Sequence, residues 1–249
     1  MLVKQENITV SADYIRRVFA CLQIESKTKH KVRSKPRKAK DSYPNLIFST
    51  WETIDRPRQV IVSDTMAFWT RLNYWELTFY FDAFTKEILG RGISSRRGDP
   101  EPLHVGLKQV LPYLNCKDEG EVTIIHTDQG SVYTSLAYNE IIKDHNVVRS
   151  CSRAGKPTDN PVNESLNGWI KEELFIDFDL YNAEDVVTSI DLYIEFYNSI
   201  RPAYSLGYDT PNNYYRRFMA GEIECAHTFQ DRILDETPKH ITKRQKAKE

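Results

Sequence analysis

The sequence predicts a mixed α/β fold in which helices cover the faces of a sheet. Two kinds of segment support this prediction: short runs rich in β-branched and aromatic residues, and longer runs with apolar residues at helical spacing. They follow the order three strands, helix, strand, helix, strand and two helices, which is typical of a mixed sheet flanked by helices. The expected strands cover 59–68, 74–84, 86–94, 121–130 and 146–150, and the expected helices cover 101–114, 134–145, a long stretch from about 160, and 183–199.

The first three strands are predicted from their apolar patterns. Residues 59–68 form an apolar run of the kind found in buried strands. In the second run, residues 74–84, every other side chain is apolar, and a period of two is typical of a strand. One face of the 74–84 segment would carry Trp75, Leu77, Phe79 and Phe81, and the other Glu76, Thr78, Tyr80 and Asp82. Residues 86–94 are expected to pair with this strand as a hairpin.

The later elements alternate between helices and strands. Leu103, Leu107 and Val110 lie at helical spacing within 101–114. The β-branched run at 121–130 ends in a polar glycine turn, so this strand would deliver Asp128 to its C-terminal end. The long helix is expected to begin near Asn160, because Asn is a good N-cap and Pro161 suits the first helical position.

The N-terminal part differs from the rest of the chain in charge. A short amphipathic helix is expected over 12–24, and the connector at 27–40 has eight Lys or Arg in fourteen positions. Residues 1–58 carry a net charge of +7, whereas 59–218 carry −8. A basic arm of this kind suits a polyanion such as nucleic acid, although a solvated lysine-rich linker would have the same composition. The expected division is an N-terminal helix and basic connector (1–50), a core (51–218) and a charged tail (219–249).

The composition excludes several other classes of protein. None of the apolar runs in the 249 residues approaches the roughly 18 residues that a membrane span needs, and the polar N-terminus does not resemble a secretory signal. The cysteines are scattered without a Cys-x-x-Cys pair, which argues against a zinc knuckle or a disulfide framework: Cys21, Cys116, Cys151 and Cys225. Free thiols in a reducing cytoplasm are expected.

Three acidic residues in apolar surroundings form the candidate site. Asp64 lies in the first strand, Asp128 ends a later strand, and Glu164 lies on the long helix, with thirty-five residues between the last two. Each alone has an ordinary structural explanation, such as capping or a hydrogen-bonded turn. Because an unpaired buried carboxylate is costly, all three together favour a shared Mg²⁺ site, and two such ions support in-line phosphoryl displacement.

The helix that carries Glu164 offers more than one functional group. Seven residues at 3.6 per turn bring Lys171 to the same face, with the small Gly168 between them. This face would combine a metal-binding carboxylate, space for close approach and a cation that could bind phosphate. Taken alone, however, Glu164 and Lys171 would be an ordinary solvated pair on a helix surface.

Longer motifs around these residues resemble a known family. They include SDT at 63–65, HTDQGSVYTS at 126–135, SRAGKPTDNPVNES at 152–165, WIKEE at 169–173 and YNSIRPAYSLGYDTP at 197–211. In these motifs, over residues 12–218, the chain resembles the retroviral-integrase-like DDE transposases. More narrowly, it is similar to the second-frame product of bacterial insertion sequence family three. The spacing between Asp128 and Glu164 is also that of the family.

The resemblance implies a fold, a metal site and a reaction. The fold would be ribonuclease-H-like, and Asp64, Asp128 and Glu164 would be the catalytic residues and the ligands of two Mg²⁺ or Mn²⁺ ions. The reaction would be strand cleavage at the ends of a mobile element, followed by transfer of the freed 3′-hydroxyl into target DNA. The family also keeps an Asp at the position of Asp82, for which we expect a structural role. His126, Gln129, Ser131 and Tyr133 are expected to shape the loop around Asp128 or to contact DNA.

The expected partners are DNA and further copies of the chain. The resemblance also implies a homo-oligomer on DNA, and a separate helix-turn-helix chain is a possible partner. The expected location is the bacterial cytoplasm, in association with the nucleoid. The candidate DNA-binding residues are Lys171, Asn160, Arg153, Lys156, Lys35, Arg37 and Lys38; for Asn160, capping of the Glu164 helix is the first expectation.

The sequence departs from the family pattern at several positions, which leaves alternatives open. The helix-turn-helix region ahead of the core is reduced to the 12–24 helix, and the family's Arg-Pro-His motif is Arg201-Pro202-Ala203. One alternative is a truncated remnant that binds DNA or a transposase partner without completing transposition. Another is a stand-alone ribonuclease-H-like nuclease. A phosphatase of the Asp-x-Asp type fits poorly, because the second residue after Asp64 is Met66. The recognised end sequence and the target preference are not encoded in any visible motif.

Overall fold

The computed structural model describes residues 11–24, 43–47, 50–152 and 161–223, with only the backbone described at 12, 52 and 161–164. The chain divides into two units, residues 1–38 and 39–249. In the first unit the helix α2 (Ala12–Cys21) is capped by Ser11, whose Oγ accepts a hydrogen bond from the backbone N–H of Tyr14. The helix expected over 12–24 is thereby confirmed, with its end at Cys21.

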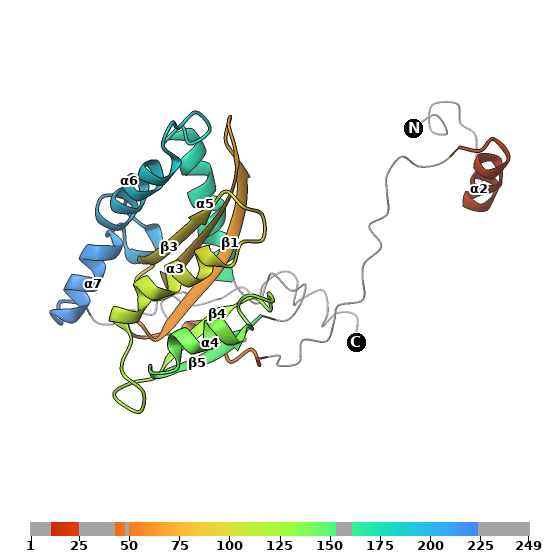
Figure 1. Ribbon diagram of the computed structural model, residues 1–249. Helices are drawn as coiled ribbons and strands as arrows, with labels where there is room; N and C mark the ends of the chain where they lie inside the picture. Colours follow the sequence, from red (N-terminus) through yellow and green to blue (C-terminus); the bar gives the residue numbers. More distant parts are fainter. Residues whose placement is uncertain (1–10, 25–42, 48–49, 153–160, 224–249) are drawn as a thin grey trace, which may run out of the picture. The chain divides into compact units, whose positions relative to one another are not determined.

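The second unit is built on one five-stranded mixed sheet (Figure 1). Its strands lie in the order β3-β2-β1-β4-β5. β1 pairs antiparallel with β2, and β2 with β3, whereas β4 runs parallel to both β1 and β5. The bounds are β1 Val60–Trp69, β2 Tyr74–Asp82, β3 Ile88–Ser94, β4 Thr123–Thr127 and β5 Val147–Cys151. The predicted mixed sheet is confirmed.

Helices cover both faces of this sheet (Figure 1). On one face α3 and α4 enclose a core that includes Tyr80 and Ile125, and on the other α5 and α6 enclose a core that includes Val62 and Phe79. Adjacent residues of one strand therefore serve two different cores, as the period of a strand requires. The helices are α3 Glu101–Val110, α4 Leu136–Ile142, α5 Pro161–Ile176, α6 Val186–Ser199 and α7 Pro211–Met219.

The helix α3 packs unusually close to β3. A Cβ atom at Gly92 of β3 would lie 1.9 Å from the carbonyl oxygen of Pro102 in α3, a distance that real contacts do not reach. Gly90 has a similar relation to the carbonyl oxygen of Gly106. The small residues of β3 therefore allow the backbones of strand and helix to approach each other, which a larger residue would prevent.

Two elements differ from the sequence-based expectation. The helix predicted over 101–114 ends at Val110 and continues as the single 3₁₀ turn Leu111–Tyr113. Pro112 is the physical reason, because it has no N–H to donate and restricts the residue before it. The helix α7 was not predicted; Thr210 caps it through Oγ1, which accepts from the N–H of Asn213, and Pro211 is its first residue.

Aromatic contacts attach α7 to the rest of the second unit. The ring of Phe84, in the turn after β2, lies 5.7 Å from that of Tyr214 and 5.0 Å from that of Phe218. None of the helices within the described residues has the length and hydropathy needed to cross a membrane.

Candidate active site

The pairing of β1 with β4 brings Asp64 and Asp128 together. Val62 is the register partner of His126 in this parallel pair. Asp64 and Asp128 each come two residues later, in the same direction. Neighbouring strands lie about 4.8 Å apart. Both side chains line the same open cavity, of about 290 Å³, which Glu76 and Asp99 also line. Two of the three predicted carboxylates therefore meet at the same edge of the sheet.

Backbone hydrogen bonds orient both carboxylates. Asp64 is half-buried, and its Oδ1 accepts from the N–H of Thr65 at 2.8 Å. Asp128 is exposed, and its Oδ1 accepts from the N–H of Gly130 at 2.8 Å. Because the donors are backbone groups next to each acid, one oxygen of each carboxylate is oriented by local structure.

The helix α5 reaches this site from the other layer through Asn167. Its Nδ2 donates to Oδ2 of Asp64 at 3.3 Å, a contact that the sequence analysis did not foresee. Glu164 lies three residues earlier in α5, which corresponds to roughly 4.5 Å along the helix axis. The first turn of α5 is thereby placed beside Asp64. Only the backbone of Glu164 is described, so its role as a third ligand stays a prediction.

The loop after Asp128 is held by buried side chains. The hydroxyl of Tyr133 lies 3.0 Å from Oγ of Ser63 on β1, and Nη2 of the buried Arg149 donates to the carbonyl oxygen of Tyr133 at 2.8 Å. Burial raises the pKa of Tyr133 well above its ordinary value, so the phenol stays neutral as a hydrogen-bonding group. His126 is buried between the hydroxyls of Ser150 and Ser152. Tyr133 and His126 therefore shape this region, one of the two roles expected of them.

The two other carboxylates of the cavity, Glu76 and Asp99, have structural hydrogen-bond partners. Oε2 of Glu76 accepts from the N–H of Gly98, and Oδ2 of Asp99 accepts from the hydroxyl of Ser94. These two acids thus connect the loop before α3 to strands β2 and β3. We find no group of three or more His, Cys, Asp or Glu suited to a metal ion among the side chains that the structure describes.

The oxygens near Asp64 nevertheless suit a hard divalent cation. Asp64 and Asp128 supply carboxylate oxygens, the ligands that Mg²⁺ prefers. Oδ1 of Asn167 is buried without a hydrogen-bond partner among the described residues, next to Asp64. An acceptor in this position is suited to a water molecule of a hydrated ion. The oxygens of Asp64 and Asp128 therefore fit a divalent metal chemically, and their role as ligands stays a prediction.

Of the predicted DNA contacts, one can be located. Lys171 is exposed on α5, two turns after Glu164 and on the same side of the helix by spacing. Gly168 between them is also exposed, and a Cβ there would have no atom within 4 Å. The remaining candidates lie outside the described residues: Lys35, Arg37, Lys38, Arg153, Lys156 and Asn160.

Several acids and bases of the motifs have structural partners. Asp82 is fully buried and forms an ion pair with Arg58 at 3.0 Å, which agrees with the structural role expected for it. Glu173 of the WIKEE motif pairs with Arg201 at 2.6 Å and accepts a hydrogen bond from Tyr193, so it connects α5 with α6. Motif membership therefore does not separate the groups that act on a substrate from those that hold the helices together.

Comparisons with protein families give one consistent result. A family model described as integrase core domain matches residues 54–157, and a second model with the same description matches residues 145–211. Together the two matches include β1 to β5, α5 and α6, and therefore Asp64, Asp128 and Glu164.

Curated relatives come from bacterial insertion sequences. The chain is 31% identical over 176 residues to the transposase of insertion sequence element IS904 from Lactococcus lactis, covering 70% of this chain and 67% of that protein. It is 27% identical over 212 residues to the InsK protein of insertion sequence element IS150 from Escherichia coli K12, covering 84% and 73%.

Solved structures with the same fold are retroviral. A chain of the simian T-cell lymphotropic virus intasome in complex with PP2A regulatory subunit B56 gamma has a TM-score of 0.55 at 14% identity, covering 86% of this chain and 73% of that one. The HTLV-2 integrase catalytic core in complex with magnesium has a TM-score of 0.50 at 17% identity, covering 64% and 97%. At such identities the likeness shows the fold alone, and the predicted ribonuclease-H-like fold is confirmed.

Proposed function

The chain belongs to the integrase core family of transposases, and we propose from this premise that it cuts and joins DNA strands at the ends of a mobile element by two-metal phosphoryl transfer. The observation that carries the proposal is the juxtaposition of Asp64 and Asp128 on neighbouring parallel strands, with α5 joined to Asp64 through Asn167. Members of this family act on DNA, and two neighbouring carboxylates support a dependence on divalent metal.

In this proposal Asp64, Asp128 and Glu164 hold two divalent ions, Mg²⁺ or Mn²⁺. Bound ions of this kind activate an attacking oxygen and stabilise the leaving oxygen of an in-line displacement. The chain itself fixes the ligand orientation: the N–H groups of Thr65 and Gly130 hold the two aspartates, and the amide of Asn167 holds the second oxygen of Asp64. Such surrounding contacts matter because ligands must be positioned before the ions arrive.

DNA binding would use the exposed side of α5. The exposed Lys171 would neutralise a phosphate near the reacting strand, and the predicted basic residues of 27–40 and 152–156 would add contacts along the duplex. The chain would act as a homo-oligomer that bridges two DNA ends in the bacterial cytoplasm, at the nucleoid. A separate helix-turn-helix chain would supply recognition of the element ends.

The test is a strand-transfer assay with the full chain and labelled oligonucleotides that carry the element's ends. We expect joined products that depend on Mg²⁺ or Mn²⁺ and disappear with Asp128→Asn. The matched control is Glu76→Gln, which neutralises another carboxylate of the same cavity while keeping an oxygen for the N–H of Gly98. The control should keep most of the activity.

Three outcomes separate the alternatives. Loss of joining with Asp128→Asn but not with Glu76→Gln supports the proposed transferase. Cleavage of RNA–DNA hybrids without joined products would identify a stand-alone nuclease instead. A folded chain that binds the ends without cutting or joining them, under any divalent ion, would identify a DNA-binding remnant.

A further inference from the structure

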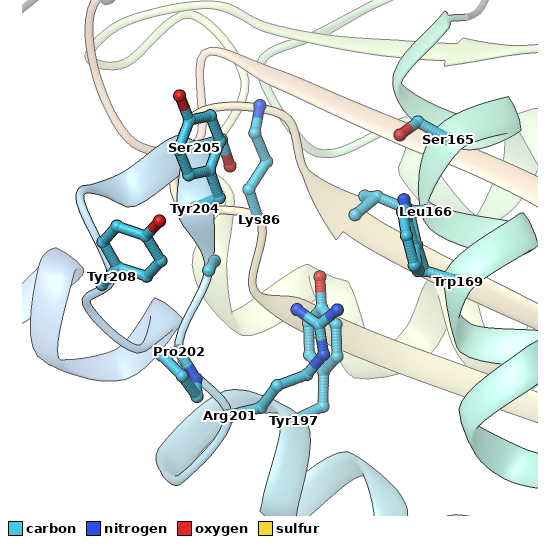
Figure 2. A pocket seen from close by; sticks show the side chains of 11 residues that line it. Lys86, Ser165, Leu166, Trp169, Tyr197, Arg201, Pro202, Tyr204, Ser205 and Tyr208 are labelled. Carbon is cyan, nitrogen blue, oxygen red and sulfur yellow. The ribbon is translucent and has the colours of Figure 1, made fainter. Parts of the chain in front are cut away.

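A second cavity, of about 540 Å³, lies on another side of α5 from Asp64. Asn167 of this helix contacts Asp64, whereas Ser165, Leu166 and Trp169 line the second cavity. The opposite wall is the segment 201–208, which follows α6 (Figure 2). Ser165 is the residue directly after Glu164, so this cavity begins beside the turn of α5 that carries the proposed third ligand.

Aromatic side chains stand open to solvent around this cavity. Trp169 is 58% exposed, Tyr204 69% and Tyr208 70%, so three large aromatic side chains are accessible around one cavity. The rings of Tyr204 and Tyr208 contact each other edge to face with centroids 5.5 Å apart. Figure 2 shows these two tyrosines across the cavity from Leu166 and Trp169, with Lys86 between them. The cavity therefore offers aromatic surface on two opposing sides.

The lining carries positive charge and no carboxylate. Its two positively charged side chains are Lys86 and Arg201. Arg201 is already paired with Glu173 and lies 5.4 Å from the centre of the Tyr197 ring, so it builds the wall. Lys86 supplies the second positive charge of the lining; its Nζ donates a hydrogen bond to the carbonyl oxygen of Ala83, and the carboxylate of Asp82 partly compensates its charge. The cavity around Asp64 and Asp128 has the opposite character, because its ionisable lining groups are acids.

Lys86 occupies a position that favours a different residue. Its φ angle is +64°, in the left-handed region where glycine or asparagine is usual, and its N–H donates to the carbonyl oxygen of Asp82 at 2.8 Å. Burial lowers the pKa of its ammonium, with the carboxylate of Asp82 acting in the opposite direction. A half-buried lysine in a left-handed turn is costly to the fold, which makes Lys86 a candidate for a functional role.

We propose that this cavity binds one unpaired nucleotide of the DNA substrate, with the base against Trp169 and the two tyrosines and its phosphate near Lys86. This inference rests on the proposed function and adds to it a preference for frayed or single-stranded ends. Aromatic faces beside a cation are the general means of holding single-stranded nucleic acid without sequence preference. The position beside the first turn of α5 would keep a displaced strand end next to the reacting phosphate.

The first experiment measures binding of the full chain to fluorescein-labelled DNA by anisotropy. Three ligands are compared: a blunt duplex, the same duplex with an overhang of four thymidines, and the same overhang built from abasic units. We expect the thymidine overhang to bind roughly five- to a hundredfold tighter than the abasic overhang, the range that stacking of bases provides. Equal binding of the two overhangs overturns the proposal.

Two matched variants locate the effect. Trp169→Ala should abolish the preference for thymidine over abasic overhangs, whereas Trp69→Ala, which removes a tryptophan of similar exposure (62%) elsewhere, should preserve it. Lys86→Gly should weaken overhang binding with only a small change in melting temperature, because glycine accepts the left-handed turn while the hydrogen bond from Nζ to the carbonyl oxygen of Ala83 is lost. A preference that survives Trp169→Ala, or overhang binding unchanged by Lys86→Gly, overturns the proposal. Binding of an acidic peptide in this cavity, with no binding of DNA there, would also overturn the proposal.

The result is separable from the proposed function. If Asp128→Asn fails to affect strand transfer, the metal site is wrong, while the overhang preference still reports on this cavity. If the chain binds none of the three DNA ligands, both proposals are wrong.

Discussion

Adding one methyl group at Gly168 is expected to stabilise the protein and to impair its action on DNA. Gly168 lies in the middle of α5, between Asn167 and Trp169, and is exposed. A Cβ there would meet no atom within 4 Å, so Gly168→Ala creates no clash within the described protein. By helical spacing Gly168 lies near the side of α5 that carries Glu164 and Lys171. A phosphate backbone that approaches this side would meet the new methyl group.

The two effects have different expected sizes. Glycine in a helix interior is about 0.8–1.0 kcal/mol less favourable than alanine, so the free energy of unfolding should rise by up to that amount. For a folded unit of this size the melting temperature should then rise by about 2–4 °C. Displacement of the reacting strand by about 1 Å costs up to ~10²-fold in rate, so we expect strand transfer to fall by at least about tenfold.

The assays are thermal unfolding by circular dichroism and strand transfer under single-turnover conditions. Gly92→Ala serves as the comparison, because the same added methyl group would lie 1.9 Å from a backbone oxygen of Pro102. Its cost should reach about 2 kcal/mol or more, since rigid backbone atoms must move. The two glycine-to-alanine changes should therefore shift stability in opposite directions.

Two results would refute this reasoning. A loss of stability in Gly168→Ala would mean that the space beside Gly168 is filled within the folded protein. A gain in stability with unchanged strand transfer would mean that DNA does not approach this side of α5, and the placement of the reacting strand would have to be revised.

Three further predictions concern charge. Asp64→Asn should abolish strand transfer while leaving the metal-free melting temperature level or higher, because it removes repulsion between neighbouring carboxylates, and Mg²⁺ should stabilise only the parent protein in a thermal-shift assay. Lys171→Ala should reduce the slope of log K against log salt by about one phosphate contact; an unchanged slope would place Lys171 away from DNA. Burial acts to raise the pKa of Asp209, but hydrogen bonds from Asn213 and Arg217 outweigh it and hold the pKa below the ordinary value. This stabilisation is therefore complete above about pH 4 and is lost as the pH falls through the lower folded-state pKa, so Asp209→Asn should be less stable than the parent at pH 7 and should approach it in acid urea titrations.

The sequence was most informative where local pattern and strand period determine structure. The five strands and the long helix were predicted close to their observed bounds, because β-branched runs and the Asn160-Pro161 start are local signals. The proximity of Asp64 and Asp128 was also predicted, although its physical basis is the register between Val62 and His126, which no local pattern specifies. The sequence predicted that Glu164 lies on a helix, but it did not predict how that helix packs relative to Asp64 and Asp128.

The features that escaped prediction depend on contacts between distant segments. The cavity lined by Lys86, Trp169 and Tyr204 combines a turn, a helix and a loop that lie far apart along the chain. The contact between Asn167 and Asp64 likewise depends on how α5 docks against the sheet. For α7 a local signal was present, since Thr210-Pro211 is a cap followed by a helix-starting proline. That signal was interpreted only as part of a family motif.

The distribution of the proposed metal ligands over two layers has a consequence for control. The separation of the two aspartates is fixed by backbone hydrogen bonds of the sheet, whereas the glutamate arrives on a helix that rests against it. A partner that slid this helix by a single turn would separate the proposed third ligand from the two aspartates without unfolding any strand. A transferase of the proposed kind would then stay inactive until it assembles on DNA.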